Sequence, residues 1–121
     1  MKIDLKKNGG FYSVYGDDAY ILFYFFDYKI SDSKVGFPLS AYNKVINKLE
    51  ENYISYKDEV NNKLVDFKRK NKYSYFVSKG KSKYSLKNRV NEIICKLNNL
   101  DENKIDEILT YIEEKLWMIN S

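Results

Sequence analysis

The first quarter of the chain alternates between polar stretches and short apolar runs. Residues 1–8 are polar and predict a loose lead-in or an edge strand. Phe11–Tyr15 is rich in strand formers and bounded by glycines, which predicts a short strand. Asp17 and Asp18 suit a helix N-terminus, where a carboxylate can accept unpaired backbone N–H groups. The apolar run over residues 19–26 fits a buried strand or a buried helix about equally, and propensity alone favours the strand slightly.

The middle of the chain predicts one amphipathic helix among short strands. Apolar residues recur at helical spacing from Leu39 to Leu49, so a helix with Pro38 in its first turn should run to about Glu51. Asn52 would close this helix in the left-handed conformation. We expect strands before and after it, over residues 28–31, 34–37, 53–57, 64–68 and 73–77.

After Gly80 the apolar period becomes helical twice in succession. The first stripe comprises Leu86, Val90, Ile93, Ile94 and Leu97, and the second comprises Ile105, Ile108, Leu109, Ile112 and Leu116. The segment between them predicts a turn with Asp101 as N-cap of the second helix. We therefore predict an α/β fold, with a small mixed β-sheet and packed helices plus a C-terminal helical hairpin. The 121 residues suit one domain, with the α/β core over 1–80 and the hairpin over 81–121.

Charge is distributed unevenly along the chain. The formal net charge is +4, and the sequence pI is about 9.0. Residues 63–83 hold eight basic side chains and one acidic side chain, a formal +7, whereas residues 101–121 hold six acidic and two basic side chains, a formal −4. The basic segment is suited to a polyanionic partner.

Composition argues against several classes of protein. The chain has one cysteine, Cys95, and no histidine, so neither an intrachain disulfide nor a zinc site is expected. We identify no nucleophile–base pair either, and we predict a non-enzymatic protein without cofactors. The longest apolar run has eight residues, against about 20 for a membrane span. With no signal-peptide pattern, the expected location is the cytoplasm.

Two sequence blocks resemble the N-terminal, mismatch-reading domain of the MutS DNA repair family. The first is Gly10-Phe11-Tyr12-Ser13-Val14-Tyr15-Gly16-Asp17-Asp18-Ala19, and the second runs from Gly36-Phe37-Pro38 to Lys48-Leu49. The similarity covers about residues 9–57. It places a helix over residues 19–26, which we therefore predict as a helix. It also implies that Phe11 takes the position of the phenylalanine that stacks on a mismatched base, with Ser13 where the family has glutamate.

The basic segment adds a second candidate contact with nucleic acid. It interleaves lysines, which neutralise phosphates, with aromatic residues, which can stack on exposed bases. A solvated hairpin with its aromatics facing the core is an equally open interpretation. The candidate nucleic-acid-binding residues are Phe11, Tyr12, Ser13, Lys48, Lys68, Arg69, Lys70, Lys72, Tyr75, Lys79, Lys81 and Lys83.

We expect this protein to recognise mispaired, distorted or single-stranded DNA with low sequence specificity, in repair or mobile-element biology. The alternative is a phage- or plasmid-encoded inhibitor that binds a host DNA-acting complex through its acidic C-terminal hairpin. Trp117 and Met118 either plug a core or form an exposed anchor for a protein partner or a homodimer.

Overall fold

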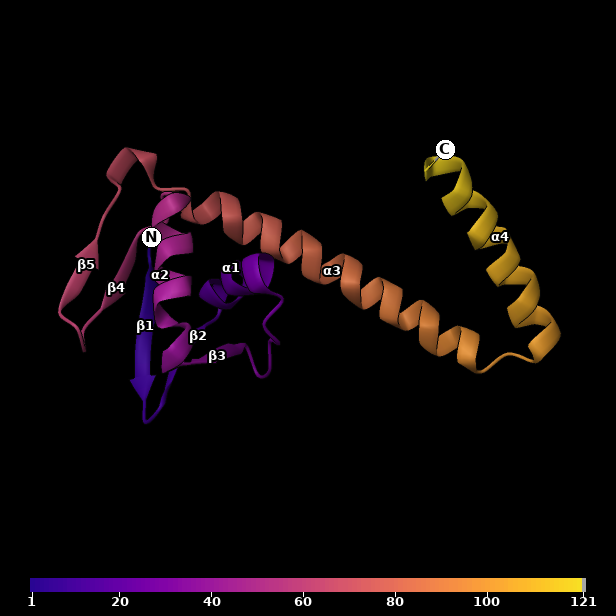
Figure 1. The fold of residues 1–121 in the computed structure, drawn as a ribbon, viewed down its shortest axis with the longest axis horizontal. Coiled ribbons are helices and arrows are strands. Elements are labelled where there is room, and N and C mark those ends of the chain that lie inside the picture. The colour runs from indigo at the N-terminus through magenta and orange to yellow at the C-terminus, as the bar shows by residue number, and fades with distance from the viewer. Residues whose placement is uncertain (121) are drawn as a thin grey trace. The chain divides into compact units, whose positions relative to one another are not determined.

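A computed structural model describes residues 1–120 (Figure 1). The chain divides into two compact units, Met1–Ser85 and a second that begins at Leu86. The elements run in the order β1 (Ile3–Asn8), β2 (Phe11–Tyr15), α1 (Asp17–Phe26), β3 (Lys34–Pro38), the 3₁₀ helix η1 (Leu39–Ala41), α2 (Tyr42–Glu51), β4 (Tyr56–Asp58), β5 (Lys63–Val65), the 3₁₀ helix η2 (Lys68–Lys70), α3 (Tyr73–Asn98) and α4 (Glu102–Asn120). This order, with a mixed sheet and packed helices, confirms the predicted α/β class.

The five strands form one sheet in the order β3-β2-β1-β4-β5. β1 pairs antiparallel with β2 and parallel with β4, while the β2–β3 and β4–β5 pairs are antiparallel. A two-residue turn joins β1 to β2, and Gly9 adopts φ +63° in it, a conformation that suits glycine. The polar N-terminal segment is therefore the central strand rather than the expected lead-in or edge strand.

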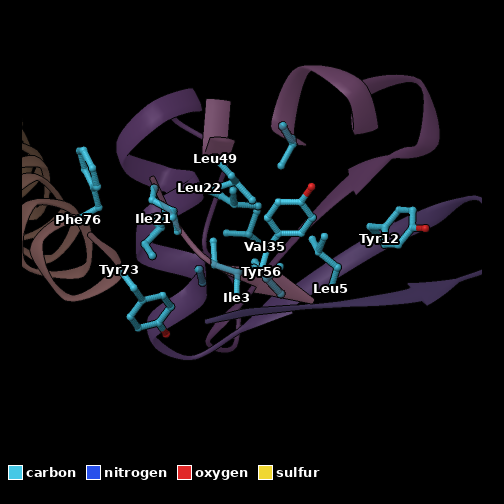
Figure 2. Close-up of a cluster of buried hydrophobic side chains, with 14 of the residues drawn as sticks. Ile3, Leu5, Tyr12, Ile21, Leu22, Val35, Leu49, Tyr56, Tyr73 and Phe76 are labelled. Carbon is cyan, nitrogen blue, oxygen red and sulfur yellow. The ribbon is translucent and has the colours of Figure 1, made fainter. Parts of the chain in front are cut away.

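One face of the sheet carries the hydrophobic core. Ile3 and Leu5 of β1, together with Tyr12 and Val14 of β2, alternate onto this face and are buried against the helices. Figure 2 shows Tyr12 at one end of this cluster, and Tyr73 and Phe76 of α3 at the other. We call this face the helix-covered face and the opposite one the open sheet face.

Helix α1 confirms the helix predicted over residues 19–26, but its two aspartates do not act as caps. Gly16 is the N-cap, and its end of the helix has no side-chain capping hydrogen bond. The Asp18 carboxylate instead accepts the backbone N–H of Asp4 at 2.9 Å and the hydroxyl of Tyr73. Asp18 thus links β1 and α3, two elements far apart in sequence.

Other predicted elements differ from the structure. Residues 28–31 form no strand beyond one isolated bridge at Ser31. Asn52 has φ −105° and caps α2 through its side-chain amide on the Lys48 carbonyl at 2.8 Å, while Tyr53 takes the left-handed conformation. Residues 73–77 begin helix α3 rather than forming a strand, because the residues at helical spacing there are the buried ones.

The second unit is helical. Asp101 caps α4 as predicted, since its carboxylate accepts the backbone N–H of Lys104 at 3.0 Å. No residue from 86 to 120 is buried. None of the helices within residues 1–120 is both long and apolar enough to cross a membrane.

Candidate nucleic-acid interface

Strand β2 presents two aromatic side chains on the open sheet face. Successive side chains of a strand point to opposite faces, so Phe11, Ser13 and Tyr15 share one face, while Tyr12 and Val14 share the other. Phe11 is 56% exposed and Tyr15 is 53% exposed, whereas Ser13 is buried between them. Four residues of strand separate the two rings by about 13 Å. The pair can therefore stack on two separate bases.

Lysines surround this aromatic pair on the same face. Lys6 of β1 lies opposite Ser13, and Lys34 of β3 lies opposite Tyr15. Lys57 of β4 lies beyond β1 on the same face, opposite Asp4 in the register of the two strands. Lys6 forms an ion pair with Asp4 at 3.1 Å, and Lys57 forms one with Glu59 at 2.9 Å. The strand positions of this face hold three lysines and one aspartate, and Glu59 adds a second carboxylate beside Lys57, so the formal charge of the face is +1.

Tyr12, which we predicted to act with Phe11, is only 2% exposed. Its ring stacks on Phe37 and Tyr42 with centroid distances of 5.8 and 5.0 Å. Its hydroxyl donates to Asp58 at 3.0 Å. Because the helices cover the face to which Tyr12 points, only Phe11 of the predicted aromatic pair is available to a ligand in this structure.

Asp58 forms the centre of a buried hydrogen-bond network at the end of β4. Its carboxylate accepts from the hydroxyls of Tyr12 and Tyr42, from the side chain of Asn61 and from the backbone N–H groups of Val60 and Asn61. Burial by itself would raise the pKa of Asp58, but the hydrogen bonds outweigh it and hold the pKa below its usual value. Burial and the bond to Asp58 raise the pKa of Tyr42 to about 12. Tyr12 and Asp58 are buried in this network, whereas Val60 and Asn61 are exposed, so the network fastens the loop after β4 to the core.

The predicted basic segment divides into an exposed part and a part engaged with the protein. Lys68, Arg69 and Lys70 form η2 and are exposed. Further along, Lys72 lies over the ring of Tyr53, and Lys79 lies over the exposed ring of Tyr75 at 5.5 Å. Because η2 exposes three consecutive cations, it is the part of the segment best suited to phosphate.

Lys81 and Lys83 bind carboxylates of α1 and its C-terminus. Lys81 pairs with Asp17 at 3.2 Å, and Lys83 pairs with Asp27 at 2.7 Å. Lys83 also donates to the carbonyl of Tyr24 at 3.0 Å, so it satisfies a free carbonyl at the end of α1. These two lysines stabilise the contact between α1 and α3, and neither is placed primarily for a ligand.

The remaining predicted residues lie apart from these groups. Lys48 is half-buried on α2, 3.9 Å from Glu51. Trp117 and Met118 of α4 are 72% and 63% exposed, so they do not plug a core. Comparisons with models of known protein families, with curated proteins and with solved structures found no match to this chain. Within residues 1–120, no group of three or more His, Cys, Asp or Glu side chains could hold a metal ion.

The sequence analysis missed Tyr15 and the three lysines of the open sheet face. The strand period could have identified Tyr15, because Phe11 and Tyr15 are separated by four residues and must share a face. Lys6, Lys34 and Lys57 carry no such signal, since the pairings β1–β2, β2–β3 and β1–β4 that bring them together are set by the sheet topology.

Proposed function

We propose that this protein binds single-stranded or locally unpaired DNA on the open sheet face, without catalysis. The observation that carries the proposal is the pair of exposed rings, Phe11 and Tyr15, on a strand flanked by Lys6 and Lys34. Exposed aromatic side chains are stacking platforms for bases, and each base–aromatic stack contributes about 1–3 kcal/mol. Lysines beside the rings supply the phosphate contacts that hold the strand in place.

The geometry favours unpaired over mispaired DNA. Wedging into a duplex costs a few kcal/mol of unstacking per step. In the family that residues 9–57 resemble, a glutamate at the position of Ser13 makes the hydrogen bond to the mispaired base. Ser13, the nearest candidate, is buried and lies opposite Gly36 and Lys6 on the neighbouring strands. We therefore infer sequence-tolerant stacking on bases that are already exposed.

The single exposed cysteine, Cys95, suits action in the reducing cytoplasm.

The exposed cations of η2 provide a second, purely electrostatic contribution. Lys68, Arg69 and Lys70 are consecutive and exposed, which suits a phosphate backbone rather than base edges. Each phosphate contact on a single strand adds about 0.7 to the slope of log affinity against log salt. If all three side chains contact phosphates, replacing them with alanine should reduce that slope by about 2.

Fluorescence anisotropy with labelled single-stranded, matched and mismatched DNA over a salt series tests the proposal. Phe11→Ala and Tyr15→Ala should each weaken single-strand binding by about 10-fold or more, since a stack is lost. Tyr111→Ala is the matched control, because Tyr111 is an exposed tyrosine on α4, 62% exposed and outside the sheet. Equal losses in all three variants would contradict stacking on the open sheet face. Absence of binding by the wild type at low salt would overturn the nucleic-acid proposal altogether.

A further inference from the structure

The C-terminal part of α3 and helix α4 carry apolar stripes with a regular heptad spacing. The α3 stripe comprises Leu86, Val90, Ile93 and Leu97 and continues at Leu100 just after the helix, and the α4 stripe comprises Ile105, Leu109, Ile112, Leu116 and Ile119. In both, separations of four and three residues alternate, which is the spacing of the a and d positions of packed helices. These side chains are not buried, and Leu86, Ile93 and Leu116 are each more than half exposed.

Each stripe is wider than the seam of a two-stranded coiled coil. Ile94 adds an apolar residue at the e position of α3 and is 48% exposed. Ile108 adds one at the g position of α4 and is 38% exposed. A stripe of a, d and one flanking position is typical of helices in a bundle, whereas a/d alone serves a two-helix seam. Two helices of one chain therefore cannot cover both stripes, and additional helices are needed.

The positions that flank the stripes carry opposite charges on the two helices. On α3 the flanking e and g positions hold Lys87, Arg89 and Lys96. On α4 and its N-cap they hold Asp101, Asp106 and Glu113, with Lys115 as the exception. Charges at e and g select helix partners, so α3 is matched to α4 and two copies of α3 side by side would repel.

We infer that the two C-terminal helices pair with those of a second copy of this chain, as an antiparallel four-helix bundle. In a two-fold symmetric arrangement, α3 of each copy contacts α4 of the other, so the complementary charges are used twice. The stripes and their flanking isoleucines hold twelve apolar side chains per copy, nine of which are between 38% and 76% exposed. A standard interface buries about 800 Å² per partner over roughly 20–30 residues, so these side chains can form the apolar centre of one.

Sedimentation velocity of the full chain over a micromolar concentration range is the first test. The wild type should approach twice the monomer mass of 14.4 kDa as its concentration rises. Ile93→Asp places a charge within the stripe and should raise the dissociation constant by about 100-fold or more. Asn88→Asp is the control, because it adds the same charge to the same helix at the f position, away from the stripe. A monomer at all concentrations, or equal effects of the two variants, overturns the inference.

Charge reversal tests whether α3 pairs with α4 of the other copy. In one variant, Arg89→Glu and Lys96→Glu make the flanks of α3 acidic, and in another, Asp106→Lys and Glu113→Lys make those of α4 basic. Each variant alone then has like charges on both helices and should stay monomeric where the wild type is dimeric. Mixing the two restores opposite charges only between chains, so the mixture should recover a dimer. A mixture that stays monomeric would contradict pairing between copies. The experiment contains no DNA, so its result does not depend on the proposed DNA binding.

Discussion

The two units of this chain differ in how far their apolar side chains are buried. In the first unit, Ile21 and Val35 are fully buried, and even a charged group, Asp58, lies in the interior with its hydrogen bonds satisfied. In the second, no residue from 86 to 120 is buried, although the apolar residues there have a regular helical period. The difference shows that the first unit has a core of its own, whereas the second leaves its periodic apolar side chains unburied.

Truncating one isoleucine in each unit should give the largest contrast. Ile21→Ala should lower the free energy of unfolding by about 2–5 kcal/mol, because it removes a fully buried side chain and leaves a cavity. Ile93→Ala, at a site 51% exposed, should change it by no more than about 0.5 kcal/mol in dilute protein. Urea titration followed by circular dichroism measures both. Similar losses from the two variants would show that the second unit is buried in the monomer.

Replacing Asp58 should give the next largest loss of unfolding free energy, because this buried carboxylate accepts several hydrogen bonds in the first unit. Asp58→Ala leaves the hydroxyls of Tyr12 and Tyr42 without their acceptor and should cost about 2–4 kcal/mol. Asp66→Ala is the control, because that carboxylate accepts only an exposed local bond from Lys68. Thermal unfolding of both variants gives the comparison, and a loss of the same size for Asp66→Ala would contradict the structural role of the buried network.

At Gly80, helix α3 approaches the backbone of α1 closely. A methyl group added there would lie 2.1 Å from the carbonyl oxygen of Tyr20, which is backbone and cannot move aside. Gly80→Ala should therefore destabilise the first unit by about 1–3 kcal/mol, despite the better helix propensity of alanine. Gly10→Ala is a matched control, because a methyl group there meets no atom within 4 Å. Stabilisation by Gly80→Ala would mean that α3 does not pack on α1 as described.

The elements with local signals could be predicted from the sequence, and those defined by distant contacts could not. Strand β2 has strand formers between glycines, helix α2 has a clear helical period, and Asp101 is a recognisable N-cap. Residues 73–77 fit a strand period as well as a helical one. The contact that decides between them, Gly80 against the backbone of Tyr20, joins residues 60 positions apart. Likewise, β1 is central because it pairs in parallel with β4, which no local pattern reveals.

In the candidate site too, the features with a local sequence signal could be predicted, and those set by distant contacts could not. The strand period places Phe11 and Tyr12 on opposite faces, but only the packing of the helices decides which of the two is exposed. Asp58 was not singled out, because a lone aspartate near a turn has no distinctive local pattern. Its importance comes from Tyr12 and Tyr42, which the sheet and α2 bring to it.

The smallest predicted effect is a pH dependence that belongs to the first unit alone. Hydrogen bonds hold the pKa of Asp58 below its usual value, so the folded state binds a proton there less readily than the unfolded state. The stability this group contributes is complete above the unfolded pKa of about 3.9 and is lost as the pH falls through the lower folded value. Burial raises the pKa of Asp18, whose contribution has the opposite sign and is lost as the pH rises.

Asp58 and Asp18 change stability with pH in opposite directions, so the pH dependence of the wild type alone does not give the contribution of either group. The difference in unfolding free energy between wild type and Asp58→Asn does, because Asp18 is common to both proteins. That difference should be constant near neutral pH and shrink below about pH 4, because there the Asp58 carboxylate binds a proton more readily in the unfolded wild type than in the folded one. Urea titrations from neutral pH down to about pH 3 measure it. A difference that stays the same or grows on acidification would show that the carboxylate is not held ionised by its hydroxyl donors.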